Sequence, residues 1–178
     1  FEKNLVKKYD KTHKVGTNSF TTIPTRIGDH DVLASSMEWF GWDIYPKGTM
    51  NNPPSLAQIA DYWRSLCSDR GIEFHVTELQ GGPNVRWGYK GNIEGPEIRL
   101  WTHQIAAHGA EVILYHGFRP PLFGSETGGF GIVKPDGSAT KRLESIKIAV
   151  SELKKISDVL KTHRLMPEVA IGYLKSSE

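Results

Sequence analysis

Several polar side chains of the sequence stand directly after short apolar or aromatic runs. They are two carboxylates, a phenol, an amide and a guanidinium: Glu78, Asp43, Tyr45, Asn18 and Arg119. A carboxylate can serve as a general acid, a general base or a nucleophile. Amide and guanidinium groups supply the donors and acceptors that bind hydroxyl-rich ligands. Together these residues predict a polar ring at one end of a set of strands.

Glu78 is the strongest catalytic candidate of this set. The apolar run Ile72–Thr77 passes through Glu78 into the turn-forming residues 81–83, so its carboxylate is expected at the rim of a sheet. The loop that follows carries Trp87 and Tyr89, which are placed to form the wall of a pocket. The alternative interpretation is a helix cap or a solvated surface carboxylate.

Composition excludes several classes of partner. The 178 residues carry 22 basic and 20 acidic side chains, a formal net charge of +2. This balance argues against nucleic acid or an anionic membrane as a partner. No apolar run approaches the ~18 to 20 residues of a membrane-spanning helix. The one cysteine, Cys67, excludes an internal disulfide and favours a cytoplasmic protein.

No pattern in the sequence calls for a metal or a cofactor. His103 and His108 are five residues apart on an expected helix, so they do not share one face as a metal pair would. A glycine-rich dinucleotide fingerprint and a phosphate-binding loop are both absent from the sequence. We therefore expect neither a metal site nor a bound cofactor.

Strand-like and helix-like segments alternate along the chain. Helices are expected over residues 2–9, from an N-cap at Ser55 to a stop at Gly71, and over residues 96–108 and 138–161. Strands are expected over residues 15–20, 39–45, 72–77, 110–115 and, after Pro167, 168–174. Strands separated by single helices predict an α/β fold with a parallel sheet and right-handed crossovers.

Loop lengths favour one of two parallel architectures. Long loops follow Glu78 and Tyr115, whereas the connections from helix to strand at Gly71 and Gly109 are minimal. This asymmetry is typical of a (β/α)8 TIM barrel, whose working face consists of the loops after the strands; a doubly wound sheet is the other possibility. A complete barrel needs about 250 residues. Four strands therefore predict about half a barrel, a fragment of a longer chain.

Several segments resemble glycoside hydrolase family 42, the β-galactosidases. The similar segments are Thr77–Trp87, Trp42–Pro46, Gly16–Asn18, Ala106–Glu111 leading to Arg119, Gly124–Glu126 and Glu168–Ile171. The resemblance implies that residues 1–163 are the C-terminal half of the barrel, about strands five to eight. It also implies that residues 164–178 are a linker and the first strand of a following domain.

The resemblance implies a retaining β-glycosidase with Glu78 as its nucleophile. Residues implied to bind the carbohydrate substrate are Asn18, Asp43, Tyr45, Trp87, Arg119 and Glu126. A retaining enzyme needs a second carboxyl group as acid and base. In the family this group is a glutamate after an asparagine at the end of strand four, and this chain contains no Asn-Glu pair. A replacement by Asp43 or Glu126 is the less favoured alternative.

The chain departs from the family pattern at two places near the expected sugar site. His116 and Gly117 stand where the family has a bulky aromatic residue and a glutamine, and Gly129 stands where it has a histidine. These departures put specificity for galactose in question.

Another class of function competes with the enzyme. A half barrel has two unpaired strand edges, which are templates for association with another chain. The alternative is thus a non-catalytic sugar-binding or half-barrel assembly module, and a homo-oligomer is compatible with either class.

Overall fold

A computed structural model describes residues 2–20, 29–49, 53–86, 91–163 and 166–172. It contains four parallel strands in the order β1-β2-β3-β4, so each strand lies beside its neighbour in sequence. The strands are β1 (Gly16–Ser19), β2 (Trp39–Ile44), β3 (Glu73–Gln80) and β4 (Val112–His116). The prediction of an α/β fold with a parallel sheet is confirmed.

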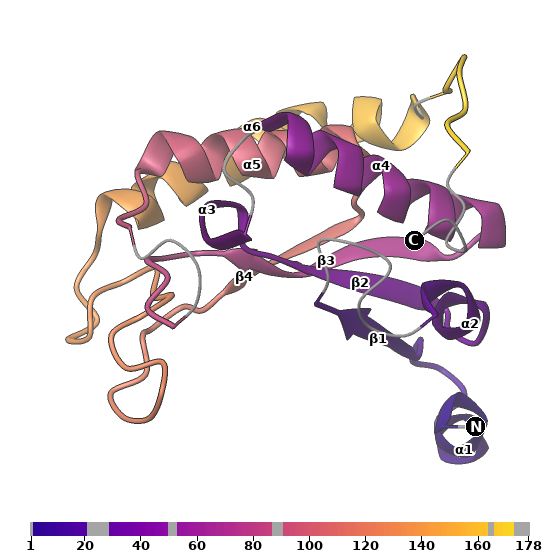
Figure 1. The fold of residues 1–178 in the computed structure, drawn as a ribbon, viewed down its shortest axis with the longest axis horizontal. Coiled ribbons are helices and arrows are strands. Elements are labelled where there is room, and N and C mark those ends of the chain that lie inside the picture. The colour runs from indigo at the N-terminus through magenta and orange to yellow at the C-terminus, as the bar shows by residue number, and fades with distance from the viewer. Residues whose placement is uncertain (1, 21–28, 50–52, 87–90, 164–165, 173–178) are drawn as a thin grey trace.

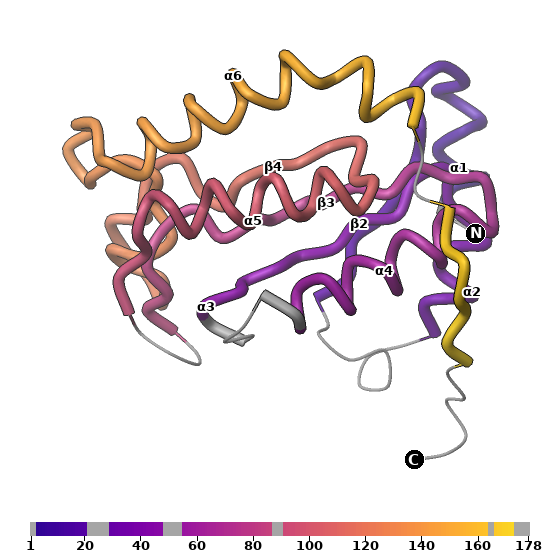
Figure 2. The backbone as a smooth tube through the Cα atoms, turned by 90° about the horizontal axis from the view of Figure 1, so that it is seen from above, coloured from indigo at the N-terminus to yellow at the C-terminus, as the bar shows by residue number. Residues whose placement is uncertain are grey.

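Three long helices cover one face of this sheet (Figures 1 and 2). They are α4 (Pro53–Arg70), α5 (Gly95–Ala107) and α6 (Lys141–Thr162). The core lies between these layers because alternate residues of each strand face the helices. Phe40, Trp42 and Ile44 of β2 are fully buried there. Cys67 of α4 belongs to the same core, and burial raises the pKa of its thiol to about 12.

The other face of the sheet is partly open in the described structure. Val112 and Leu114 of β4 point away from the helical layer and keep 36% and 54% of their surface exposed. On the same face, the rings of Trp39 and His75 stack with centroids 4.9 Å apart. An incomplete barrel would expose apolar side chains in this way, on the sheet face that the helices do not cover.

The start of α4 differs from expectation, and two short helices were not predicted. Ser55 lies inside α4 and is not its N-cap, because the helix already begins at Pro53, a residue type that suits a first turn. Gly71 ends α4 with φ of +62°, as predicted for a residue after a helix. The short helices are α2 (His30–Ser35) and α3 (Pro46–Thr49).

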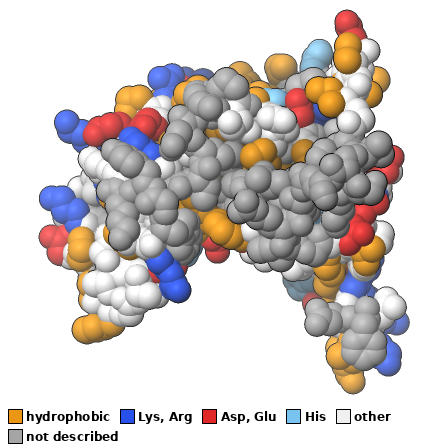
Figure 3. Space-filling model, in the orientation of Figure 1, with side chains coloured by type: hydrophobic (Ala, Val, Ile, Leu, Met, Phe, Trp, Pro, Cys, Tyr) orange, Lys and Arg blue, Asp and Glu red, His pale blue; other side chains and the backbone are white. Residues whose placement is uncertain are grey.

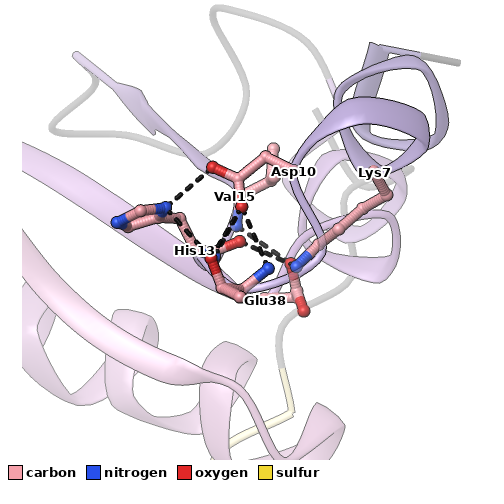
Figure 4. Close-up of polar contacts among 6 residues, drawn as sticks. Lys7, Asp10, His13, Val15 and Glu38 are labelled. Carbon is pink, nitrogen blue, oxygen red and sulfur yellow. Dashed lines mark hydrogen bonds and ion pairs between the residues drawn. The ribbon is translucent and has the colours of Figure 1, made fainter.

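Helix α1 (Glu2–Tyr9) is attached to the start of the sheet by a polar cluster (Figure 4). The Glu38 carboxylate accepts a hydrogen bond from the Val15 backbone N–H and pairs with Lys7 Nζ, both at 2.9 Å. Lys7 also donates to the His13 carbonyl at 2.7 Å. One carboxylate thus links α1, the entry to β1 and the entry to β2.

Residues 166–172 are irregular and exposed, so a strand there is a wrong prediction as far as these residues are described. The apolar residues Val169 and Ile171 are 80% and 93% exposed. Their strand propensity finds no partner strand, and an unpaired strand is not stable by itself. Residues 173 and 174 of the expected strand lie outside the described residues.

The surface agrees with the balanced composition. On the face visible in Figure 3, basic and acidic side chains are interspersed and form no single charged patch. None of the helices in the described ranges has the length and apolar character needed to cross a membrane.

Candidate active site

Glu78 lies inside β3, two residues before the strand ends at Gln80. The sequence predicts it directly after a strand that ends at residue 77. The strand continues to Gln80 because Leu79 and Gln80 pair with Tyr115 and His116 of β4. The strand register shifts next to Glu78, both against β2 and against β4. Such irregularities bend a strand and re-aim its side chains. The carboxylate of Glu78 is left 35% exposed at the carboxyl end of the sheet.

Tyr45 holds one oxygen of this carboxylate. Its hydroxyl donates a short hydrogen bond to Glu78 Oε2, and the tyrosine is only 2% exposed. Burial, and after it the hydrogen bond to Glu78, raise the pKa of the Tyr45 phenol far above its ordinary value. The phenol therefore keeps its proton and remains a donor to Glu78.

Asp43 forms a second hydrogen-bonded group beside this pair. Its two oxygens accept from Thr77 Oγ1 at 2.7 Å and from the Asn18 side-chain amide. Asp43 is 6% exposed, and burial raises the pKa of its carboxyl, an effect that the nearby Glu78 charge reinforces and the Thr77 hydrogen bond opposes. Three adjacent strands thus contribute to one polar network.

The loop over residues 118–137 brings Glu126 to the same site. Figure 1 shows this loop, in orange, beside the carboxyl ends of β3 and β4. His116 Nε2 lies 3.9 Å from Glu126 Oε2, and His116 Nδ1 lies 4.0 Å from Glu78 Oε1. Ser125, next to Glu126, accepts a hydrogen bond from Arg86 in the segment after β3. The loop is therefore held against the strand that carries Glu78.

The predicted site residues differ in how they are placed. Asn18, Asp43, Tyr45 and Glu78 come together in one network, which Glu126 reaches through His116. Arg119 is exposed, and its Nε donates to the Pro135 carbonyl at 2.7 Å, so it braces the loop. No described contact brings Arg119 to Glu78. Trp87 and the neighbouring Tyr89 lie outside the described residues.

Sequence reasoning assigned no site role to Thr77 and Phe130, and it noted His116 near the expected sugar site only as a departure from the family pattern. His116 is the last residue of β4 and lies at the same carboxyl edge of the sheet as Glu78 in β3. A position at a strand end is the signal that identified the other candidates. Phe130 packs its ring against Tyr45 and His116, with centroids 5.3 and 5.4 Å away. Nothing local in the sequence marks Phe130, because its partners are far from it along the chain.

The chemistry that this arrangement can perform follows from its donors. Among the described residues, no group of three histidine, cysteine or acidic side chains is gathered as a metal site would be. Instead, a half-exposed carboxylate is supported by a phenol and faces an imidazole. A carboxylate in that setting can attack an electrophilic carbon, and the surrounding amide and carboxyl groups can bind hydroxyls.

A carboxylate at the carboxyl ends of parallel strands lies where barrel enzymes have their active sites, and comparison with known proteins identifies the family. The sequence profile of glycoside hydrolase family 42, described as beta-galactosidase, matches residues 1–156. The chain belongs to this family, whose fold is the TIM barrel.

Individual relatives agree with the family assignment. The beta-galactosidase of Thermus thermophilus is 30% identical over 160 residues, which cover 81% of this chain and 24% of that protein. The chain thus spans about a quarter of the length of the curated relatives that it matches.

Two solved structures share the fold. The beta-galactosidase of the haloarchaeon Halorubrum lacusprofundi superposes with a TM-score of 0.74 at 25% identity, covering 86% of this chain and 24% of its own. That of the psychrophilic Marinomonas ef1 superposes with a TM-score of 0.74 at 22% identity, covering 90% and 26%.

Proposed function

We propose that this chain is the C-terminal half of the catalytic barrel of a retaining glycoside hydrolase that acts on β-galactosides or related sugars. The observation that carries the proposal is the placement of Glu78, half-exposed at the carboxyl end of β3 with the Tyr45 hydroxyl on Oε2. Strands β1 to β4 are then strands five to eight of the barrel.

Glu78 is the nucleophile in this mechanism. Its free oxygen attacks the anomeric carbon of the sugar, the bond from that carbon to the leaving oxygen breaks, and the electron pair departs with the leaving group. Water then releases the sugar from Glu78 in a second displacement with net retention. Tyr45 keeps the carboxylate oriented, and Asn18, Asp43 and Glu126 bind sugar hydroxyls, with Trp87 and Arg119 as further ligands.

The carboxyl group that acts as acid and then as base in this reaction comes from outside this chain. The two carboxyl groups of a retaining enzyme lie ~5 to 5.5 Å apart. Both oxygens of Asp43 accept hydrogen bonds, from Asn18 and from Thr77, so Asp43 is not available as the acid. Because the chain spans about a quarter of its relatives, we place the second carboxylate in a preceding half barrel. Residues 1–163 belong to the barrel and residues 164–178 to a linker and a following domain.

Covalent trapping tests the nucleophile in the complete protein that carries this chain. The probe is a dinitrophenyl β-galactoside with fluorine in place of the hydroxyl next to the anomeric carbon. Its leaving group departs as the phenolate without needing a proton, so the first displacement does not depend on the acid carboxyl. We expect one sugar adduct on Glu78 by peptide mass spectrometry, none in Glu78→Gln, and an unchanged adduct in the surface variant Glu144→Gln. An adduct on another residue, or full hydrolytic activity in Glu78→Gln, overturns the assignment.

The exposed sheet face favours one second candidate, a half-barrel assembly module. Strands β1 and β4 are the edges of the described sheet, and Leu114 is 54% exposed beside one of them. Two copies that pair through these edges would cover the unpaired strands and the exposed Leu114. Equilibrium sedimentation of the 178-residue chain distinguishes the cases: a concentration-dependent dimer without trapping supports assembly, and a strict monomer excludes it.

A further inference from the structure

His116 lies between the two carboxylates of the site and presents a different ring nitrogen to each. Nδ1 lies 4.0 Å from Glu78 Oε1 on β3, and Nε2 lies 3.9 Å from Glu126 Oε2 on the loop 118–137. We propose that His116 is a positioning residue: it couples the position of the Glu126 carboxylate to that of Glu78 and so keeps both at the sugar subsite. This inference rests on the proposed function, in which Glu78 is the nucleophile.

The orientation of the His116 ring is fixed by packing. Phe130 lies against it at 5.4 Å and Tyr45 meets it edge-on at 6.1 Å. Phe130 is itself 1% exposed, and its backbone bonds to Pro83 and Gly117, both at 2.8 Å. These contacts restrict rotation of the ring, although 36% of the His116 side chain is exposed.

His116 is also the basic side chain that the two carboxylates share. Within the described ranges, no lysine or arginine comes within the 4.0 Å ion-pair distance of Glu78 or Glu126, and His116 meets both. An imidazole offers a donor on each nitrogen only when it is protonated. The groups that face it are Glu78, Glu126, the Tyr45 phenol and, more distantly, the Asp43 carboxyl.

Both separations are too long for direct hydrogen bonds. The link is therefore charge attraction, or a hydrogen bond through one water at each nitrogen. Either form ties the position of Glu126, on the loop 118–137, to Glu78 in the sheet. The Tyr45 hydroxyl donates to Oε2 of Glu78, and His116 Nδ1 lies near Oε1. The two oxygens of the proposed nucleophile therefore have different partners.

A double-mutant cycle on the trapping reaction tests this coupling. The variants are His116→Phe, Glu126→Gln and the combination, with trapping by the fluorinated dinitrophenyl galactoside measured as the second-order rate constant. Each single change should slow trapping by about tenfold. The combined variant should be no slower than the worse single variant, because the loss of His116 already uncouples Glu126.

Matched variants separate positioning from folding. His103→Gln removes a histidine that pairs with Glu152 at 3.1 Å on the helical layer, and it should trap at the wild-type rate. If His116→Phe fails to fold, His116→Gln keeps a polar group of similar reach and takes its place in the cycle.

The outcomes distinguish the two proposals. If wild type forms no adduct on Glu78, the proposed function fails and the positioning role fails with it. If wild type is trapped but the two single effects multiply in the combined variant, or His116→Phe keeps the wild-type rate, the positioning role alone is wrong.

Discussion

Thr77 and Glu78 are consecutive residues of β3, yet both side chains reach the same face of the sheet. Thr77 donates to Asp43 and Glu78 accepts from Tyr45, and Asp43 and Tyr45 are alternate residues at the end of β2. Regular pleating would send one of the two to the helical layer. The shift in register between Val76 and Leu79 removes this conflict. The irregularity lets one short segment supply both a structural hydroxyl and the candidate nucleophile.

Loss of the Tyr45 hydroxyl should slow glycosyl trapping more than it changes stability. Hydrogen bonds to charged groups contribute about 1.5–3 kcal/mol, so Tyr45→Phe should reduce the trapping rate by about 10- to 100-fold. Tyr115→Phe is the matched control, because its hydroxyl pairs with Thr102 at 2.7 Å in the helical layer. That variant should keep the rate and lose about 1 kcal/mol of unfolding free energy. Equal rates for Tyr45→Phe and wild type would contradict the role of Tyr45.

Replacement of Asp43 by asparagine should stabilise the fold near neutral pH. Burial raises the folded-state pKa of Asp43, so the protonated carboxyl favours folding and this contribution is lost as pH rises through the raised value. Asp43→Asn stays neutral and can still accept from Asn18 and donate to Thr77. We expect a gain on the order of 1 kcal/mol in urea unfolding near pH 7 that shrinks toward acid pH.

The alanine variant provides the comparison for this experiment. Asp43→Ala leaves Asn18 and Thr77 without their acceptor and should destabilise the protein by about 1–3 kcal/mol at both pH values. A gain of Asp43→Asn over wild type that grows as pH falls would show that the sign is wrong.

The link between α1 and the sheet should weaken in acid. The Val15 backbone N–H, and after it Lys7, hold the pKa of Glu38 below its usual range. A lowered folded-state pKa means that the stabilising contact is present above the unfolded value and lost as pH falls through the folded one. Glu38→Gln should therefore reduce hydrogen-exchange protection of residues 2–15 at neutral pH, to the level that wild type shows in acid.

The control for this prediction is Glu144→Gln, which removes an exposed pair with Lys147 on α6. It should leave protection of residues 2–15 unchanged. Full protection in Glu38→Gln would show that other contacts attach α1.

A methyl group at Gly82 should disturb the loop that carries Glu126. A Cβ there would lie 2.5 Å from the Gly131 carbonyl oxygen, and backbone atoms cannot yield as a flexible side chain can. Gly82→Ala should cost about 1–3 kcal/mol of unfolding free energy and slow trapping as well. Gly172→Ala, where the added methyl meets open space, should change neither quantity. A Gly82→Ala protein with wild-type stability and rate would contradict this contact.

The sequence predicts those parts of the structure whose signals are local. The aromatic run that forms β2 and the apolar face of α4 have clear periods of two and about 3.6, and both elements are found. Helix α2 has six residues, too few to show a period, although Asp29 caps it with hydrogen bonds to Asp31 and Val32. The C-terminal strand is predicted from a strand-like run after Pro167 and from the resemblance to the family, and residues 166–172 pair with no other described strand.

The site could be predicted only in part for a related reason. Asn18, Asp43, Tyr45 and Glu78 follow apolar runs, and parallel strands bring such ends together. His116 gains its partners only when the loop after it folds back and returns Glu126, ten residues later, to the same strand ends. The turn of Thr77 and Glu78 to one face depends on pairing with two neighbouring strands, which no single segment encodes.

Phe130, with φ of +59°, closes the base of the loop 118–137 through its backbone bonds to Pro83 and Gly117. The tip of that loop, around Leu122 and Phe123, is exposed and contributes nothing to the core. Insertions and substitutions at the tip are therefore tolerated without moving the Tyr45–Glu78 pair. The outer residues of this loop can therefore vary independently of the two strands beneath it.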